Sequence, residues 1–434
     1  MNNIDLTKIK NIYFLGIGGI GVSAIARMFK SEGKDVSGID ASDSVIIEGL
    51  RKEGIEVLIG SNSSSVPPDT DLVVYTRALE VADAHILEEV KSTGVQVMSY
   101  PEVLNKISSD KYTIAVSGMH GKTTTTAMCS HIWSDLGKSP TTIVGSVMKE
   151  TNSNYLHGES EYFIVEADEY RRSFLHLNPK ILIITNIEED HLDYYKDLED
   201  IKDAFSMLVQ KVPKDGYIIC DKEDEIVSSV TKDTQATVVD YKKYITDIPT
   251  LLTKGEFNRK NAACAVAAAV CCGMDKEQAF KSIATFRGTW RRFEYIGETE
   301  KGAKVYDDYA HHPTEIKSTL NMIKEEFSDK KVYIAFHPHL YSRTKLLFEG
   351  FAESLADPFF EVVLLPIYPA REEFDPSITS EMLAEEIEKK GGNARVIDTF
   401  SEIEAYFASI LGPDDILVTM GAGESNKIAY NLAK

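Results

Sequence analysis

The stretch YTIAVSGMHGKTTTTAMCSHIW, residues 112–133, decides the fold class of this 434-residue chain. Its first six residues are mostly apolar and predict a buried strand, while its last part has the length and composition of a helix. The turn between them carries glycines, a lysine and hydroxyl groups, at Gly118, Gly121, Lys122, Thr123 and Thr124. Such groups at a strand-to-helix turn bind nucleotide phosphates, and the first hydroxyl binds Mg²⁺. The match to the full phosphate-loop motif is partial, because Val116 stands where its first glycine would be.

Strand-like apolar runs alternate with helix-length amphipathic segments along the chain. The runs are IYFLGI (12–17), DLVVYT (71–76), YTIAVSG (112–118), YFIVEAD (162–168), ILIITNI (181–187), VYIAFHP (332–338), EVVLLPIY (361–368) and DILVTMGAG (415–423). This alternation predicts α/β domains with largely parallel sheets, and the length predicts two to three of them. We place the domains at residues 1–109, 110–297 and 298–434, since new strand-turn-helix patterns begin after each boundary.

Composition and charge exclude several classes of protein. Hydrophobic residues make up 43% of the chain, enough for sizeable cores, and the net charge of -21 repels phosphate backbones and anionic lipids. We therefore expect no nucleic-acid or membrane partner. Because the sequence also has no signal peptide and no apolar run of membrane-spanning length, we expect a soluble cytoplasmic protein. The oligomeric state cannot be deduced from the sequence.

A glycine-rich turn also follows the first predicted strand. Gly16, Gly18, Gly19 and Gly21 form a G-x-G-x-x-G pattern before a good helix, and Asp40 ends the next strand. In this context the glycines let the backbone approach a diphosphate, and the acidic residue can bind a ribose hydroxyl. The pattern fits a nicotinamide dinucleotide or a UDP-sugar equally well, and a tight turn without a ligand is the third interpretation.

Acidic residues follow two further strands of the middle region. Glu166 begins the run EADE at the end of one strand, and His191 ends the run EEDH after another. Open α/β sheets bind ligands at the carboxyl ends of their strands, so these side chains could surround a Mg²⁺ ion that carries phosphates. Each run taken separately could be a solvated loop, but three such strand ends together indicate an ATP–Mg²⁺ site. Two successive phosphate-binding turns also make a dehydrogenase the weaker interpretation.

The ordered motifs resemble those of the Mur ligase family over essentially the whole chain. They are GIGGIGVSAIA, GMHGKTTT, EADEYRRSFLHL, TNIEEDHLD, FNRKNAACAVAAA, GTWRRFEYIGE, DDYAHHPTEI, PHLYSRT and PIYPARE. The resemblance implies an N-terminal Rossmann-like UDP-binding domain, a central ATPase domain with a mostly parallel sheet and a C-terminal Rossmann-like domain. It also implies an ATP-dependent ligase of peptidoglycan synthesis, most similar to the branch that joins L-alanine to UDP-N-acetylmuramate.

The resemblance assigns roles that the residues alone leave open. It implies that Lys122 binds the β/γ-phosphates, that Thr123 binds one Mg²⁺ and that Glu166 and His191 bind a second. The remaining matched positions would contact ATP (Asn258, Asn261, Arg292, Asp308), the UDP diphosphate (Gly16, Gly18, Gly19, Gly21) and the amino acid (His311, His339, Arg343). Lys122, Glu166, His191 and Arg292 would then be the catalytic groups, acting by positioning and charge neutralisation.

One departure from the family pattern concerns the amino acid. Leu340 stands where many members of the alanine-adding branch carry a second arginine, so carboxylate recognition would depend mainly on Arg343. A Mur-type ligase for another amino acid or for murein tripeptide therefore remains an alternative. A nicotinamide oxidoreductase and a non-catalytic nucleotide-binding module are the alternatives from other classes.

Overall fold

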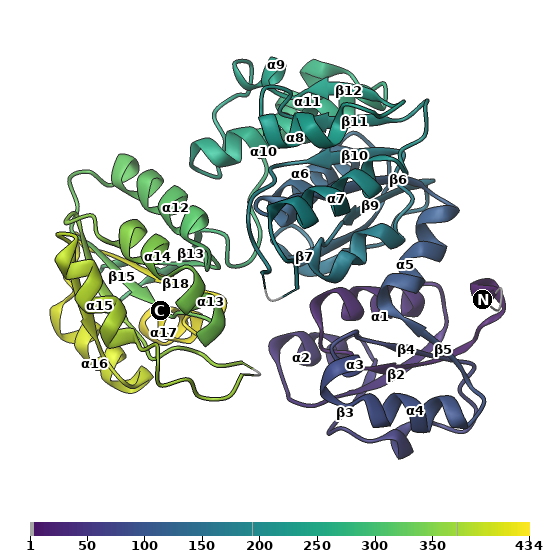
Figure 1. Ribbon diagram of the computed structural model, residues 1–434, viewed down its shortest axis with the longest axis horizontal. Helices are drawn as coiled ribbons and strands as arrows, with labels where there is room; N and C mark the ends of the chain where they lie inside the picture. Colours follow the sequence, from purple (N-terminus) through teal and green to yellow (C-terminus); the bar gives the residue numbers. More distant parts are fainter. Residues whose placement is uncertain (1–3, 193, 371) are drawn as a thin grey trace. The chain divides into compact units, whose positions relative to one another are not determined.

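The computed structural model describes residues 4–192, 194–370 and 372–434, and these contain three β-sheets flanked by helices (Figure 1). The chain forms two compact units, residues 1–252 with 259–287 and residues 253–258 with 288–434. Two residues of the quoted motifs, Asp193 of TNIEEDHLD and Arg371 of PIYPARE, lie outside the described residues.

The first sheet is a five-stranded parallel sheet of order β3-β2-β1-β4-β5. Its strands are β1 (Asn11–Leu15), β2 (Asp35–Asp40), β3 (Glu56–Ile59), β4 (Leu72–Tyr75) and β5 (Gln96–Ser99). The helices of this part are α1 (Ile20–Ser31), α2 (Val45–Lys52), α3 (Leu79–Ala82), α4 (Ala84–Ser92) and α5 (Tyr100–Ser109), with two short 3-10 turns, η1 (Leu6–Lys8) and η2 (Ser63–Ser65).

The second sheet has seven strands in the order β12-β11-β10-β6-β9-β7-β8 and belongs to the same unit. Its strands are β6 (Tyr112–Ser117), β7 (Thr141–Met148), β8 (Ser153–Leu156), β9 (Tyr162–Glu166), β10 (Ile181–Ile184), β11 (Tyr217–Cys220) and β12 (Thr237–Asp240). The associated helices are α6 (Lys122–Asp135), η3 (Tyr170–His176), α7 (Leu198–Val209), α8 (Glu225–Thr231), α9 (Lys242–Ile245), α10 (Glu256–Cys271) and α11 (Lys276–Ile283). Only β8 runs antiparallel to its neighbour among these described strands.

The third sheet, in the second unit, has the order β13-β14-β18-β15-β16-β17. Its strands are β13 (Glu294–Glu298), β14 (Lys304–Asp308), β15 (Val332–Phe336), β16 (Phe360–Leu364), β17 (Asn393–Val396) and β18 (Ile416–Met420). The helices are α12 (Pro313–Glu326), α13 (Tyr341–Leu346), α14 (Phe348–Leu355), α15 (Ser380–Lys389), α16 (Phe400–Ile410) and α17 (Asn426–Leu432). All neighbours are parallel except β13, which pairs antiparallel with β14. The three sheets confirm the predicted α/β class.

Helices cover both faces of each sheet, so the central strands are buried on two sides and read as continuous apolar runs. In β1, Ile12 and Phe14 join the core beneath α1, α2 and α5, whereas Tyr13 and Leu15 face α4. In the second sheet α6, α10 and α11 pack on one face, and α7 and α8 on the other. The third sheet likewise lies between α12, α14 and α15 and the pair α16 and α17.

The described helices begin in two ways, with a side-chain cap at the first turn or without one. Side-chain oxygens cap the starts of α7, α11, α15 and α16, because Asp197, Asp275, Thr379 and Thr399 accept from their first-turn amides. By contrast, α1 and α6 follow the N-cap residues Gly19 and Gly121 and, like several other described helices, have no side-chain cap. Their first-turn N–H groups are therefore available to an anionic ligand.

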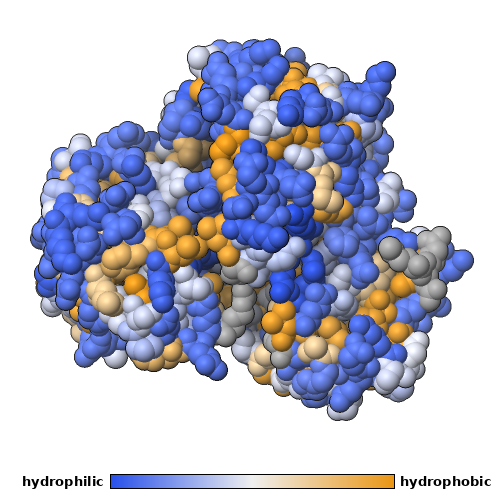
Figure 2. Space-filling view, viewed as in Figure 1, coloured by the Kyte–Doolittle hydropathy of each residue, from blue (hydrophilic) through white to orange (hydrophobic). Residues whose placement is uncertain are grey.

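The surface drawn in Figure 2 is mostly hydrophilic, consistent with a chain in which 26% of the residues are charged. Hydrophilic side chains cover most of the face drawn in Figure 2, and hydrophobic ones gather in separate small patches. None of the helices in the described part of the chain has both the length and the apolar character that crossing a bilayer requires.

Candidate active site

The phosphate loop joins β6 to α6 in the second sheet. Gly118 and Gly121 have φ angles of 128° and 84°, which side-chain-bearing residues rarely adopt. Space is limiting as well, since a Cβ on Gly118 would lie 2.9 Å from the Asn186 carbonyl oxygen and one on Gly121 would lie 2.6 Å from Asn261 Oδ1. Both glycines of the predicted loop are thus required by backbone conformation and by close packing.

Asn186, which sequence reasoning did not select, holds this loop in shape. Its Oδ1 accepts from the backbone N–H groups of Met119 and His120, at 3.1 and 3.0 Å. The residue follows β10, which pairs with β6, so the carboxyl ends of these strands are neighbours. A polar TN dipeptide after an apolar strand is the sequence feature that could have indicated Asn186. The loop residues it binds, Met119 and His120, are distant in sequence, so the pattern alone does not show the contact.

Lys122, the first residue of α6, is folded back over the loop. Its Nζ donates to the carbonyl oxygens of Gly118 and Met119, at 2.6 and 3.0 Å, and lies 2.9 Å from Glu169 Oε2. Burial alone lowers the pKa of Lys122, but the carboxylates of Glu169, Asp168 and Glu166 outweigh it and raise the pKa above its usual value. The lysine is therefore a fixed positive charge at the phosphate-binding turn.

Glu169 connects Lys122 with His191, and sequence reasoning missed it as well. Its side chain is 1% exposed, and His191 Nε2 lies 3.3 Å from its Oε1. Burial raises the pKa of Glu169, but Lys122 and His191 lower it by more than burial raises it. The pKa of this carboxyl group is therefore below its usual value. For His191 burial lowers the pKa, and the hydrogen bond to Glu169 together with nearby carboxylates raises it overall. The EADE run contained the residue, but only the fold shows that its fourth position carries a buried carboxylate.

Thr123, in the first turn of α6, contacts Glu166 at the end of β9. Thr123 Oγ1 donates to Glu166 Oε1 at 3.0 Å, and the Gly145 N–H donates to Oε2 at 2.8 Å. A hydroxyl and a carboxylate in contact offer the hard oxygen ligands that Mg²⁺ prefers, so these residues fit the predicted ion. Thr124 is the next residue of the same helix and is buried. His191 contacts Glu169 and Asp190 rather than Glu166 in this arrangement.

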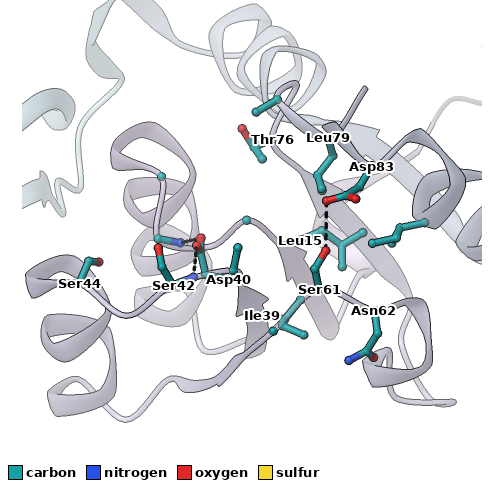
Figure 3. A pocket seen from close by; sticks show the side chains of 17 residues that line it. Leu15, Ile39, Asp40, Ser42, Ser44, Ser61, Asn62, Thr76, Leu79 and Asp83 are labelled. Atoms are coloured by element: carbon teal, nitrogen blue, oxygen red, sulfur yellow. Dashed lines mark hydrogen bonds between the residues drawn. The ribbon is translucent and has the colours of Figure 1, made fainter. Parts of the chain in front are cut away.

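A cavity of about 410 Å³ opens at the carboxyl edge of the first sheet (Figure 3). Gly16, Gly18, Gly19 and Asp40, the candidates for UDP binding, line it together with residues of the segments after β3 and β4. Asp40 Oδ2 accepts from the Gly18 N–H at 2.8 Å, so this carboxylate also holds the glycine turn in shape. Figure 3 shows Ser61 directed toward Asp83, to which it donates at 3.2 Å.

Gly21, the last glycine of the pattern, does not belong to the cavity lining. A Cβ at this position would lie 2.6 Å from both Cζ and Oη of Tyr100, the first residue of α5. The structure thus gives Gly21 a packing role against a phenol ring. The sequence pattern alone could not separate close helix packing from approach to a phosphate.

The predicted residues of the second unit surround the carboxyl ends of β14 and β15. His311 and His339 have ring centroids 6.4 Å apart, and Arg343 Nη1 lies 3.5 Å from His339 Nδ1. The three amino-acid-binding candidates are therefore brought together. Leu340, beside them, has φ 68° and ψ 133°, a conformation that is strained for a side-chain-bearing residue.

Arg292 and Asp308 have different environments in that unit. The guanidinium of Arg292 lies 5.3 Å from the Tyr309 ring centroid and 3.7 Å from Glu315. Asp308 accepts from the N–H groups of Phe293 and Ala310, and its burial raises its pKa to about 7, partly offset by Arg292. Asp308 thus shapes the turn that carries His311.

The two asparagines of α10 have different contacts. Asn258 Nδ2 donates to the Lys254 carbonyl oxygen at 2.7 Å within the second unit. Asn261, in the first unit, has its amide oxygen beside Gly121 of the phosphate loop. Contact with the loop is therefore seen for Asn261.

A phosphate loop, acidic groups on the neighbouring strand ends and a separate cavity beside a glycine turn define the class of P-loop α/β nucleotide-binding enzymes. Three models of Mur ligase domains match the chain. The Mur ligase family catalytic domain matches residues 11–112, the Mur ligase middle domain residues 116–248, and the glutamate ligase domain of Mur ligases residues 291–423. The chain belongs to the Mur ligase family.

Curated relatives and solved structures agree. The chain is 38% identical to the UDP-N-acetylmuramate–L-alanine ligase of Clostridium tetani over 97% of both chains, and 38% identical to that of Clostridium acetobutylicum over 96% of both. Its structure is similar to that of the UDP-N-acetylmuramate–alanine ligase of Thermotoga maritima, with a TM-score of 0.80 and 26% identity, covering 97% of this chain and 98% of that one. A murein peptide ligase of Psychrobacter arcticus shares the fold, with a TM-score of 0.72, 24% identity and 98% of both chains covered.

Proposed function

We propose that this protein joins L-alanine to the lactyl carboxylate of UDP-N-acetylmuramate with consumption of ATP, as a step of peptidoglycan precursor synthesis. The observation that carries the proposal is the Lys122–Glu169–His191 cluster around a buried carboxylate, beside the Thr123–Glu166 pair and in the same unit as the 410 Å³ cavity. The names of the relatives support the same substrates. We place the reaction in the cytoplasm, where ATP and nucleotide sugars are supplied.

The proposed reaction has two chemical steps. The carboxylate oxygen of the sugar attacks the γ-phosphorus, and the bond to the ADP oxygen breaks, which yields an acyl phosphate. The amine of L-alanine then attacks the acyl carbon after loss of a proton, and phosphate leaves with the electron pair of the broken C–O bond. Activation is required because phosphate is a much better leaving group than a carboxylate oxygen.

The chain's own groups would act mainly by positioning and charge neutralisation. The uncapped first turn of α6 and the Lys122 ammonium would bind the transferred phosphoryl group. Thr123 would hold one Mg²⁺, and Glu166 with His191 would hold a second, as the family resemblance predicts. The ions would supply positive charge to the phosphate oxygens.

The remaining assignments belong to the same proposal. Gly16, Gly18, Gly19 and Asp40 would bind the UDP part, while Asn258, Asn261, Arg292 and Asp308 would contact ATP. His311, His339 and Arg343 would bind L-alanine. The corresponding three-part division is residues 1–109 for the nucleotide sugar, 110–297 for ATP and 298–434 for the amino acid.

Phosphate release tests the proposal directly. The purified protein is given ATP, Mg²⁺ and UDP-N-acetylmuramate with single amino acids or with murein tripeptide, and the product mass is measured. We expect release and an alanyl product with L-alanine. Reaction with tripeptide alone would assign the chain to another branch, and a nicotinamide-dependent absorbance change without phosphate release would contradict ligase chemistry.

A further inference from the structure

The nucleotide cavity of the first sheet carries the wrong charge for a diphosphate. Among the described residues that line it, the ionisable ones are Asp40 and Asp83, and there is no Lys or Arg. A diphosphate brings negative charge into this surface, and the chain as a whole has a net charge of -21. A cation just outside the lining would offset this negative charge.

The glycine turn cannot supply all the missing donors. The N–H groups of Gly16 and Ile17 donate to the Ile39 carbonyl oxygen, at 2.8 and 3.2 Å, and that of Gly19 donates to Gly16 at 3.3 Å. The N–H group of Gly18 is held by Asp40. Four successive amides of the turn thus have partners inside the protein, which leaves the first-turn amides of α1 for a ligand.

Arg77 is the cation nearest to this cavity along the chain. Its neighbours Thr76 and Ala78 both line the cavity, and the Thr76 side chain packs on Gly16. The Arg77 side chain is 31% exposed, and its Nε lies 3.3 Å from Glu80 Oε2. A guanidinium has five N–H groups in a planar fork, so this contact leaves donors for an anion.

The guanidinium is directed away from the first sheet toward the groups that surround the phosphate loop. Arg77 Nη1 donates to the carbonyl oxygen of Arg171 at 3.1 Å. Arg171 lies in η3, two residues after Glu169, the partner of Lys122 and His191. Arg77 therefore lies on the side of the cavity from which a bound nucleotide sugar would extend toward the phosphoryl-transfer site.

The backbone segment that accepts the hydrogen bond from Arg77 has an unusual conformation. Arg171 and Arg172 have successive left-handed conformations, with φ 51°, ψ 30° and φ 57°, ψ 27°. The side chain of Arg172 is held by Asp200 at 2.6 Å and Asp203 at 3.1 Å, which keeps the segment in place. Strained backbone persists where its surroundings determine it and is concentrated at functional sites.

We propose that Arg77 binds the diphosphate of the nucleotide-sugar substrate where it leaves the cavity, and that the Arg171 carbonyl oxygen holds the guanidinium in that position. The inference rests on the proposed function, because it takes a UDP-linked sugar as the ligand. The competing interpretation is that Arg77 serves only to tie the turn after β4 to the segment after Glu169.

Two substitutions and two ligands separate these interpretations. Arg77→Gln removes the charge but keeps a donor for the Arg171 carbonyl oxygen, and Arg77→Lys keeps the charge without the planar fork. Binding of UDP and of uridine is titrated by calorimetry or ligand-observed NMR. Lys91→Ala is the matched control, since it removes an exposed cation at the far end of α4 that pairs only with Glu88 at 3.2 Å in the described part of the chain.

We expect Arg77→Gln to weaken UDP binding about tenfold or more and to leave uridine binding unchanged, with Arg77→Lys intermediate and Lys91→Ala unaffected. Added salt should weaken UDP binding less in Arg77→Gln than in the unmodified protein. Equal losses for UDP and uridine, or an unchanged UDP affinity, would overturn the inference alone. Failure of the unmodified protein to bind UDP would overturn the proposed function together with it.

Discussion

Glu169 connects the charged groups beside the phosphate loop, because its buried carboxylate contacts both Lys122 and His191. Removal of either cationic partner leaves a charge in a site that is 1% exposed. Breaking a buried ion pair on one side is more costly than replacing both partners. This difference allows the role of Lys122 in stability to be separated from its role in the reaction.

We expect Lys122→Ala to lower turnover at least about a hundredfold, on the scale of losing one preorganised charge at the transferred phosphoryl group. Stability should fall as well, because Glu169 loses its ammonium partner. The double variant Lys122→Ala/Glu169→Gln should regain much of the free energy of unfolding, measured in urea, while its turnover stays low. UDP affinity should persist in both variants. A single variant with near-normal turnover would contradict the phosphate-loop assignment.

His337 gives a pH dependence in the second unit. Burial lowers its pKa to about 4, with Arg291 acting in the same direction and Glu424 and the Pro366 carbonyl oxygen opposing it. In the unfolded chain the ring titrates near its ordinary pKa of about 6.5. Between these values the unfolded chain binds more protons, so the free energy of unfolding decreases as the pH is lowered from about 6.5 toward 4.

We therefore expect the His337 contribution to remove up to about 3 kcal/mol of stability across that pH range. His337→Gln cannot titrate, so its free energy of unfolding should decrease less between pH 7 and pH 4.5 than that of the unmodified protein. Other groups, such as Asp308 with its raised pKa, titrate in both proteins and cancel in the difference. Parallel pH profiles from urea titrations would show that the ring titrates normally in the folded state.

At the scale of elements, α1 and α5 meet at Gly21. The backbone of Gly21 is helical, so alanine would fit its conformation and would favour the helix by about 1 kcal/mol. The Tyr100 ring opposes the substitution, because it lies 2.6 Å from the position of the new Cβ. Overpacking of this kind costs about 1–3 kcal/mol, so the clash should outweigh the gain in propensity.

We expect Gly21→Ala to destabilise the protein, and the second substitution Tyr100→Leu to relieve part of the loss. Tyr100→Phe is the control that should give less relief than Tyr100→Leu, because it removes Oη but leaves Cζ 2.6 Å from the new Cβ. Stability is measured by urea unfolding, and UDP affinity by calorimetry. If Gly21→Ala weakens UDP binding and Tyr100→Leu restores nothing, the glycine serves phosphate approach instead of packing.

Some strands of the sheets could be predicted from the sequence and others could not. Central strands such as β1, β6 and β10 were found because burial on both faces leaves a continuous apolar run before a turn. The hairpin of β7 and β8 and the edge strand β13 were not assigned as strands, since their pairing is antiparallel and peripheral and their sequences are mixed. Edge pairing depends on contacts that are distant in sequence, which periodicity does not report.

The residues of the candidate site also differ in how far they can be predicted from local sequence. Gly16, Gly18 and Lys122 could be predicted because turn chemistry is local in sequence. Glu169, Asn186 and Arg77 could not be selected, because their importance comes from partners on other strands or loops. Gly21 matched the pattern, but its neighbour Tyr100 is 79 positions away in the chain, so its packing role became visible only in the fold.

At the scale of the whole molecule, the two compact units have separate cores. The clusters beneath the first and second sheets contain residues of the first unit, and those of the third sheet contain residues of the second. The 410 Å³ cavity and the phosphate loop belong to the first unit, while His311, His339 and Arg343 belong to the second. Ligand binding to one unit should therefore stabilise that unit more than the other.

Hydrogen exchange with mass spectrometry can measure this difference. UDP at about 100 times its Kd should stabilise the first unit by about 2.7 kcal/mol, so its slowest amides should exchange about a hundredfold more slowly. The slowest amides of β15 and β18 in the second unit should keep their rates, because UDP has no predicted ligand there. NAD at the same concentration is the control and should change neither unit. Equal protection of both units by UDP would show that they unfold together, and protection by NAD would favour the dinucleotide interpretation of the glycine turn.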